Sequence, residues 1–248
     1  SLEYFFTTGA NMDLAGKTEL ITGAAGGLAS ALAIRGAPQG AELIFLDKKR
    51  RGLGELSDRM TDRGFLPPGL YPLNLAAAGV EEFNDLVDTI NSEFSGLDAL
   101  VHCAVYFDSL QPIEQVQPQD WLQSMQVNVN APWLLSCTLL PLLKKSKSGH
   151  LLFLLDDLDA VTDAYWGAYG VGKAALTGIV RQFDAETNHT PVSVHGIIPG
   201  PMRTGFRARV YHAENLMEQP EPAVVARKIT AILAGSVSER DLILNLSE

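Results

Sequence analysis

Short runs of apolar residues alternate along the chain with longer segments in which apolar residues recur every three or four positions. Short apolar runs bounded by turn residues predict strands, and the longer periodic segments predict helices. Because the short runs are almost continuously apolar, both faces of the sheet should be buried, as in a parallel sheet covered by helices. The expected strands are Thr18–Thr22, Ala41–Leu46, Leu70–Leu73, Ala99–Cys103, His150–Leu155, Val192–Ile198 and Leu242–Leu246.

Three of the helical segments are well marked. Val80–Phe94 repeats apolar residues at helical spacing. A second helix is expected from Pro118, a favourable first-turn residue, to about Lys145, and a third from about Tyr165 to about Glu186. This alternation predicts an α/β fold with a doubly wound parallel sheet of about seven strands and helices on both faces.

The length of 248 residues suits one domain with a large core, and no repeat or linker divides it. We assign residues 13–248 to this domain and residues 1–12 to an N-terminal extension. The first twelve residues lack the basic start and apolar stretch of a signal peptide, and no apolar run approaches the roughly 20 residues that span a bilayer. We therefore expect a cytoplasmic protein.

The charge balance narrows the choice of partners. The chain has 19 basic and 29 acidic residues and a formal net charge of −10, which argues against binding to nucleic acid or to anionic membranes. Cys103 and Cys137 lie in apolar stretches without metal-ligand spacing. We expect buried free thiols rather than a disulfide, and no metal site.

A glycine-rich turn follows the first strand and leads into a helix. Gly23, Gly26 and Gly27 let the backbone turn tightly and approach a pyrophosphate, to which the amides of the helix N-terminus can donate. A plain strand-to-helix turn is the alternative, but its place after the first strand of an alternating chain favours a nucleotide site.

The second strand leads to Asp47, about 20 residues past the glycines, where an acceptor for a ribose hydroxyl is expected. A carboxylate there favours NAD, because it would repel the extra phosphate of NADP. The basic run from Lys48 to Arg51 could instead pair with that phosphate or form a solvated turn. The expected cofactor is NAD or NADP, with NAD favoured.

Tyr169 and Lys173 are four residues apart on an expected helix, so they can share one face. A nearby ammonium favours the phenolate and lowers the pKa of a tyrosine. Tyr169 could then transfer a proton to or from a substrate oxygen while a hydride moves. The alternative is an exposed contact between helix neighbours that does no chemistry.

Four motifs in this order resemble the short-chain dehydrogenase/reductase family, which has a Rossmann-type fold, and the resemblance runs from Leu14 to the C-terminus. Residues 22–29 (TGAAGGLA) correspond to the family's TGxxxGxG, residues 169–173 to YxxxK and residues 199–204 to PGxxxT, with Asn128 in the long helix. The sequences around Asn128 and Tyr169 are similar to those of a bacterial subgroup of oxidoreductases without well-defined substrates. The resemblance implies that Asn128, Asp156, Tyr169 and Lys173 occupy catalytic positions and that the cofactor contacts Thr22, Gly23, Ala25, Gly26, Gly27, Leu28, Asp47, Lys48, Asn74, Leu75, Cys103, Ala104, Val105, Tyr169, Lys173, Pro199, Gly200, Met202 and Thr204.

Asn128 precedes Pro132 by four residues, and proline has no amide hydrogen to donate to the Asn128 carbonyl. A carbonyl freed in this way needs another partner. A water molecule linking it to Lys173 would suit the proton relay that the resemblance implies. A simple helix kink is the competing account.

The catalytic serine of the family is missing. The position thirteen residues before Tyr169 holds Asp156, whose ionised carboxylate would oppose the negative charge that builds up on the substrate oxygen. The family's NNAG segment reads His102-Cys103-Ala104-Val105, Ala29 replaces the third glycine, and Asn74 replaces an aspartate. These departures weaken the cofactor site somewhat and the catalytic site more.

Two functions remain open. The first is an active NAD(P)-dependent oxidoreductase that interconverts a small carbonyl and an alcohol, with Asp156 turned aside or protonated and donating. The second is a catalytically impaired relative that binds a dinucleotide or serves as an assembly subunit. A flavodoxin-like binding fold would leave the motifs at residues 169–173 and 199–204 unexplained.

The resemblance also implies a homodimer or homotetramer formed through the two long helices. Trp133, Leu134, Leu139, Leu142 and Leu143 would allow this, or they could belong to the intramolecular core. The segment from Pro201 to Pro220 should cover a ligand or form a solvated loop. Its candidate substrate contacts are Phe206, Arg207, Arg209, Tyr211 and His212.

Overall fold

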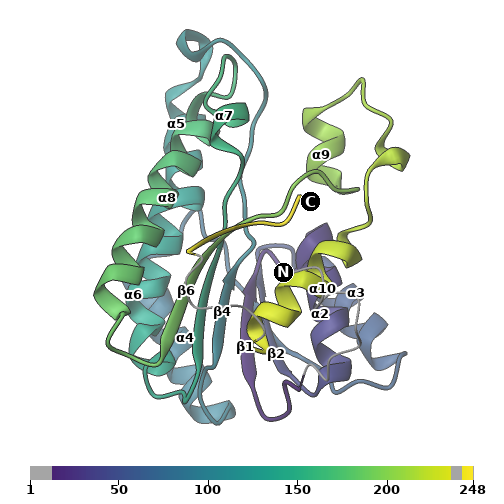
Figure 1. Ribbon diagram of the computed structural model, residues 1–248, viewed down its shortest axis with the longest axis vertical. Coiled ribbons are helices and arrows are strands. Elements are labelled where there is room, and N and C mark those ends of the chain that lie inside the picture. The colour runs from purple at the N-terminus through teal and green to yellow at the C-terminus, as the bar shows by residue number, and fades with distance from the viewer. Residues whose placement is uncertain (1–12, 236–241, 248) are drawn as a thin grey trace.

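A computed structural model describes residues 13–235 and 242–247, and its strands form one parallel sheet in the order β3-β2-β1-β4-β5-β6-β7 (Figure 1). The extension expected at residues 1–12 lies outside the described residues. The predicted doubly wound sheet is confirmed, and the expected strand ends are correct to within one residue. The strands are β1 (Thr18–Thr22), β2 (Glu42–Asp47), β3 (Gly69–Pro72), β4 (Ala99–His102), β5 (Gly149–Leu154), β6 (Val192–Ile198) and β7 (Ile243–Asn245).

Helices cover both faces of this sheet (Figure 1). On one face lie α2 (Gly27–Gly36), α3 (Arg50–Thr61) and α10 (Pro222–Leu233), and on the other lie α4 (Val80–Glu93), α6 (Ala131–Leu143) and α8 (Gly167–Thr187). No helix in the described part of the chain is both long and apolar enough to span a bilayer. The short elements are α5 (Pro118–Met125), α7 (Leu158–Val161), α9 (Gly205–Val210) and the 3-10 turns Ala37–Gln39, Ile113–Gln115 and Leu216–Glu218.

The single helix expected between Pro118 and about Lys145 is interrupted. A π-helical turn, Gln126–Asn130, joins α5 to α6, and the amide of Ala131 donates to the carbonyl of Gln126. Pro132 cannot donate an amide hydrogen, so a wider turn at this place is physically reasonable. The turn lies where Asn128 is buried in the interior, with 2% of its surface exposed.

Two apolar layers hold the helices on the sheet. Phe45 and Leu56 belong to the layer under α2, α3 and α10, and Phe83 and Leu139 to the layer under α4, α6 and α8. Of the positions considered for oligomer contacts, Leu139, Leu142 and Leu143 belong to this core, Leu134 is partly buried, and Trp133 is 48% exposed.

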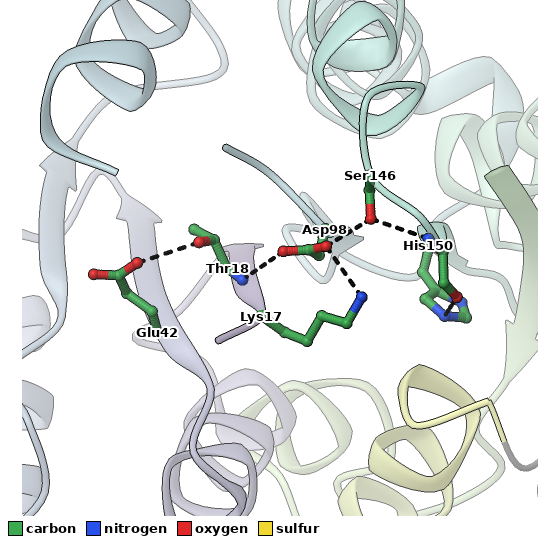
Figure 2. A network of polar contacts seen from close by, with 7 residues as sticks. Lys17, Thr18, Glu42, Asp98, Ser146 and His150 are labelled. Carbon is green, nitrogen blue, oxygen red and sulfur yellow. Dashed lines mark hydrogen bonds and ion pairs between the residues drawn. The ribbon is translucent and has the colours of Figure 1, made fainter. Parts of the chain in front are cut away.

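Polar contacts fasten the starts of the strands at the edge opposite the expected site. The carboxylate of Asp98 accepts hydrogen bonds from the Thr18 amide at 3.0 Å, from Lys17 Nζ at 3.2 Å and from Ser146 Oγ at 2.6 Å (Figure 2). Thr18 Oγ1 donates in turn to Glu42 at 3.2 Å. These residues, the amino-end clamp, join β1, β2, β4 and the turn before β5.

The two cysteines are free thiols, as expected, but they differ in exposure. Cys103 is half-buried next to the core, whereas Cys137 on α6 is exposed. The expectation that both would be buried is therefore wrong for Cys137, because its position on α6 turns away from the sheet.

Candidate active site at the carboxyl ends of the strands

The carboxyl ends of β1 and β4 lie side by side where the strand order reverses, the usual place for a ligand in a doubly wound sheet. Thr22 Oγ1 accepts hydrogen bonds from the amides of Cys103 and Ala104, both at 3.2 Å. Gly23 has a φ of +66°, and a Cβ there would lie 2.7 Å from the Ala104 Cα. Glycine is thus required at this position for the approach of two backbone segments.

The N-terminus of α2 is open toward solvent. Gly26 and Gly27 are exposed, and the first-turn amides of a helix have no acceptor within the helix itself. A hollow of about 330 Å³ adjoins this turn and is lined in part by Gly27, Ser30, Arg203 and Glu221, with Arg203 Nη1 3.6 Å from Glu221 Oε1. Free amides and helix polarity fit the pyrophosphate of a dinucleotide, and Arg203 would have to leave Glu221 to join them.

Asp47 makes two backbone contacts that the sequence does not reveal, and its contact with a ribose stays a prediction. Its carboxylate accepts hydrogen bonds from the Ala25 amide at 3.1 Å and from the Lys49 amide at 2.9 Å. The side chain therefore braces the glycine turn against the end of β2. The flanking Lys48 and Arg51 are exposed.

The other expected cofactor contacts occupy loops at the same edge of the sheet. Asn74 is exposed, and its side-chain oxygen accepts from the Ala76 amide at 3.2 Å. Leu75 is buried, and Val105 is 37% exposed. After β6, residues 199–204 lead to Thr204, whose hydroxyl caps α9 by accepting from the Arg207 amide at 3.2 Å. Pro199 and Gly200 follow β6 and precede buried Met202, and Leu28 is buried in the first turn of α2.

Tyr169 and Lys173 on α8 both face the interior, with 4% and 5% of their surfaces exposed. The Tyr169 hydroxyl donates to Asp156 Oδ2 at 2.6 Å, and Lys173 Nζ donates to the Leu154 carbonyl at 2.6 Å. Lys173 Nζ lies 5.5 Å from the centroid of the Tyr169 ring. The alternative of an exposed helix contact is therefore wrong, and the three side chains meet at the end of β5.

The electrostatics of this group differ from the expectation. Burial, followed by the Asp156 carboxylate, raises the pKa of Tyr169 well above its ordinary value. Burial lowers the pKa of Lys173, although Asp156 opposes this. The expected lowering of the Tyr169 pKa is wrong for this arrangement, because burial of the phenol and then the Asp156 carboxylate at hydrogen-bonding distance both raise it.

Asn128 fastens the segment after β4. Its side-chain oxygen accepts from the Tyr106 amide at 2.9 Å, and its amide group donates to the Tyr106 carbonyl at 2.8 Å and to Ser124 Oγ at 3.0 Å. A Cβ on Gly172 would lie 3.4 Å from the Asn128 Cβ, so α8 packs closely here. The water relay to Lys173 stays a prediction.

Aromatic rings pack around Tyr169. Phe107 and Phe206 lie 5.6 Å from its ring centroid and Trp166 lies 5.5 Å away. Phe206 was a candidate from its loop, but Phe107 and Trp166 were missed. The spacing of Trp166, three residues before Tyr169, could have indicated a neighbour on the same helix face.

His102, at the first position of the altered NNAG segment, is another buried residue that the sequence did not explain. Its Nε2 lies 2.8 Å from Ser136 Oγ, and its ring stacks on Phe153 with centroids 4.8 Å apart. Burial lowers the pKa of His102 to about 3. The neutral ring thus serves packing between β4, β5 and α6.

Comparisons with known proteins agree with this geometry. The family model described as short chain dehydrogenase matches residues 17–215. The uncharacterized oxidoreductase YciK from Escherichia coli K12 is 32% identical over 82% of this chain and 81% of its own. A short chain dehydrogenase structure from Pseudomonas syringae is 33% identical with a TM-score of 0.90, covering 96% of this chain and 98% of that one. A Shigella flexneri structure in complex with NADP is 28% identical with a TM-score of 0.89, covering 94% of this chain and 98% of that one.

Proposed function

Since the chain belongs to the short-chain dehydrogenase family, we propose that it interconverts a carbonyl and an alcohol by hydride transfer with NADP(H) or NAD(H). The main support for this proposal is that the Tyr169 hydroxyl, the Lys173 ammonium and the Asp156 carboxylate lie together at the end of β5. In reduction, a hydride and a proton add to the carbonyl compound, and the oxidised dinucleotide and the alcohol leave.

The dinucleotide would occupy the open edge beside α2. The amides at the N-terminus of α2 and Arg203 in the adjoining hollow would hold its phosphates, and Thr204 would lie near its nicotinamide end. When bound, the nicotinamide supplies or accepts the hydride. Both oxygens of Asp47 accept amide hydrogens, and Lys48 and Arg51 beside it are exposed, so we infer that NADP binds at least as well as NAD.

Tyr169 would transfer the proton. During reduction its hydroxyl gives a proton to the substrate oxygen, and Lys173 stabilises the negative charge left nearby. This requires Asp156 to release the Tyr169 hydroxyl. A protonated Asp156 can do so and can donate its own hydrogen to the substrate oxygen, in place of the family's serine, as carboxylic acids held neutral by their surroundings do in other enzymes.

The impaired binding protein is the second candidate, and the Tyr169–Asp156 hydrogen bond favours it. An ionised Asp156 holds the tyrosine proton and raises the pKa of Tyr169. Turnover would then be slow even with the cofactor bound. Loss of one donor to a developing oxyanion costs about 10²–10³ in rate.

The test combines cofactor binding with turnover. Binding of NADPH and NADH is measured by titration, with nicotinamide fluorescence as the signal. Reduction of a panel of aldehydes and ketones is then followed for the wild type, Asp156→Ser, Asp156→Asn and the control Asp159→Asn. Asp159 is exposed and lies on α7.

A donor role for Asp156 predicts measurable wild-type turnover that changes in Asp156→Asn and stays the same in Asp159→Asn. Cofactor binding without wild-type turnover, together with gain of turnover in Asp156→Ser, would favour the impaired protein. Absence of binding by both dinucleotides would reject both candidates.

A further inference from the structure

An aromatic enclosure, formed by Phe107, Trp166, Phe206 and Tyr211, surrounds the ring of Tyr169. Phe107 meets Tyr169 edge-on, with an interplanar angle of 88°, and meets Phe206 edge-on at 5.7 Å and 72°. Trp166 lies between Tyr169, at 5.5 Å, and Tyr211, at 6.2 Å. Three of these rings therefore contact the ring that carries the proposed acid.

The enclosure is closed around Tyr169. A cavity of about 20 Å³ beside Phe107, Trp166 and Tyr169 holds about one water molecule. A substrate oxygen must nevertheless reach the Tyr169 hydroxyl, so at least one ring has to move before any reaction.

Phe206 is the ring that can leave. It belongs to α9, a helix of 6 residues in the segment between β6 and α10. Phe107 is held in place, because its neighbour Tyr106 is bound through both backbone groups to Asn128. Trp166 immediately precedes the 21-residue helix α8. Displacement of α9 would thus uncover part of the Tyr169 ring and leave a ring-sized space against Phe107 and Tyr169.

We propose that the substrate is an uncharged carbonyl compound, or the matching alcohol, that carries an aromatic ring one or two carbons from the reacting carbon. Its ring takes the place of the Phe206 ring against Phe107, with its oxygen at Tyr169. This inference rests on the proposed function and adds the substrate class to it. Edge-to-face contacts with Phe107 favour an aromatic ring over a saturated ring of equal size.

Charge at the cavity supports an uncharged substrate. Asp108 and Asp120 line the cavity beside Phe107, and Asp156 is hydrogen-bonded to Tyr169 of the same lining, so a carboxylate or phosphate would be repelled. Arg209 acts electrostatically on Tyr106 of the cavity lining, where the two carboxylates offset its charge. Arg207 is paired with Glu214 through two hydrogen bonds of 2.6 and 2.7 Å and is therefore not free to hold an anionic group.

The test compares ligands that differ only in the ring. Calorimetry of the NADP-loaded protein gives the dissociation constants of 2-phenylethanol and 2-cyclohexylethanol, and kcat/KM is measured for phenylacetaldehyde and cyclohexylacetaldehyde with NADPH. A methylene group separates ring and carbonyl in both aldehydes, so their intrinsic reactivities are similar. We expect the phenyl compounds to be favoured about tenfold in both measurements.

Variants locate the preference. Phe107→Leu should bring the phenyl-to-cyclohexyl ratio to within about twofold of one. Phe206→Ala should lower KM for both aldehydes, because the competing ring is gone, and should leave the ratio unchanged. The control Phe65→Leu removes a ring that packs against the opposite face of the sheet and should change neither quantity. Thermal unfolding of each variant reports whether it folds.

Equal affinities for the two alcohols, binding of neither, or a ratio unchanged by Phe107→Leu would overturn the inference. Turnover of both aldehydes at the same rate would overturn it while leaving the proposed function intact. A phenyl preference in the binding measurement without turnover of any aldehyde would support the substrate class and count against the proposed reaction.

Discussion

At the scale of single residues, Asp156 determines how the site behaves. Its distance of thirteen residues from Tyr169 is visible in the sequence, but its hydrogen bond to Tyr169 is not. Motif spacing therefore predicted which residues meet, whereas the direction of the Tyr169 pKa depended on burial and on a carboxylate 2.6 Å away. Such effects follow from three-dimensional surroundings that spacing does not encode.

Asp47 gives a first prediction at this scale. Because it accepts from the Ala25 amide, Asp47→Ala should loosen the glycine turn and weaken the binding of both NADPH and NADH about tenfold. Asp47→Asn keeps one acceptor and removes the charge, so it should raise the ratio of NADPH to NADH affinity. Fluorescence titration measures both, with Asp88→Ala on the exposed side of α4 as control. Weaker binding of NADH alone in Asp47→Ala would instead indicate ribose recognition.

At the scale of elements, the periodicity located the strands well and the long helices less well. The apolar run of Val192–Ile198 is a strand with the expected bounds. The helix expected from Pro118 is split by the turn at Gln126–Asn130. The missing amide hydrogen of a proline indicates where the helical hydrogen bonds are interrupted, but it does not indicate which geometry the backbone adopts there. The exposure of Cys137 was not predicted, because apolar neighbours in the sequence do not show which face of the helix a residue lies on.

Strand β1 gives the second prediction, since it carries a buried acid near the amino-end clamp. Glu19 is 1% exposed, and burial, with a smaller effect of Asp98, raises its pKa from 4.5 to about 8. The folded protein thus binds this proton more tightly than the unfolded chain, and the resulting stability is lost as the pH rises through the interval from 4.5 to about 8.

Burial lowers the pKa values of His102 and His150 from 6.5 to about 3 and about 4, so these residues make the protein more stable as the pH rises toward 6.5. The loss of stability caused by Glu19 should therefore be visible above pH 6.5, where the histidines no longer oppose it. Between about pH 6.5 and about pH 8.5, the free energy of unfolding should fall by on the order of 2 kcal/mol. Urea denaturation should show this fall in the wild type and in the control Glu93→Gln. Glu19→Gln should remove this fall. If the variant shows the same fall as the wild type, a group other than Glu19 causes it.

At the scale of the whole molecule, fold and family were readable because seven strand patterns and four motifs agree with one architecture. Oligomeric state is not readable in the same way. Leu139, Leu142 and Leu143 are used in the core, so apolar character alone does not identify an interface.

The exposed apolar residues give the third prediction. Leu122 on α5, Trp133 on α6 and Val171 on α8 are 68%, 48% and 42% exposed. If a second copy covers these helices, Trp133→Glu should convert the oligomer to a monomer in light scattering coupled to size-exclusion chromatography, because burial of a charge at an interface is costly. The control Leu66→Glu, at an exposed site after α3, should leave the mass unchanged. A monomeric wild type would contradict the homo-oligomer.

The contact between Thr204 and Gly27 links the two halves of the site. A Cβ on Gly27 would lie only 3.0 Å from Thr204 Cγ2, and Thr204 caps the helix that carries Phe206 two residues later. A pyrophosphate at the glycine turn would therefore lie beside the residue that caps the short helix carrying Phe206. We therefore expect the dinucleotide to bind first and the second reactant to bind after it.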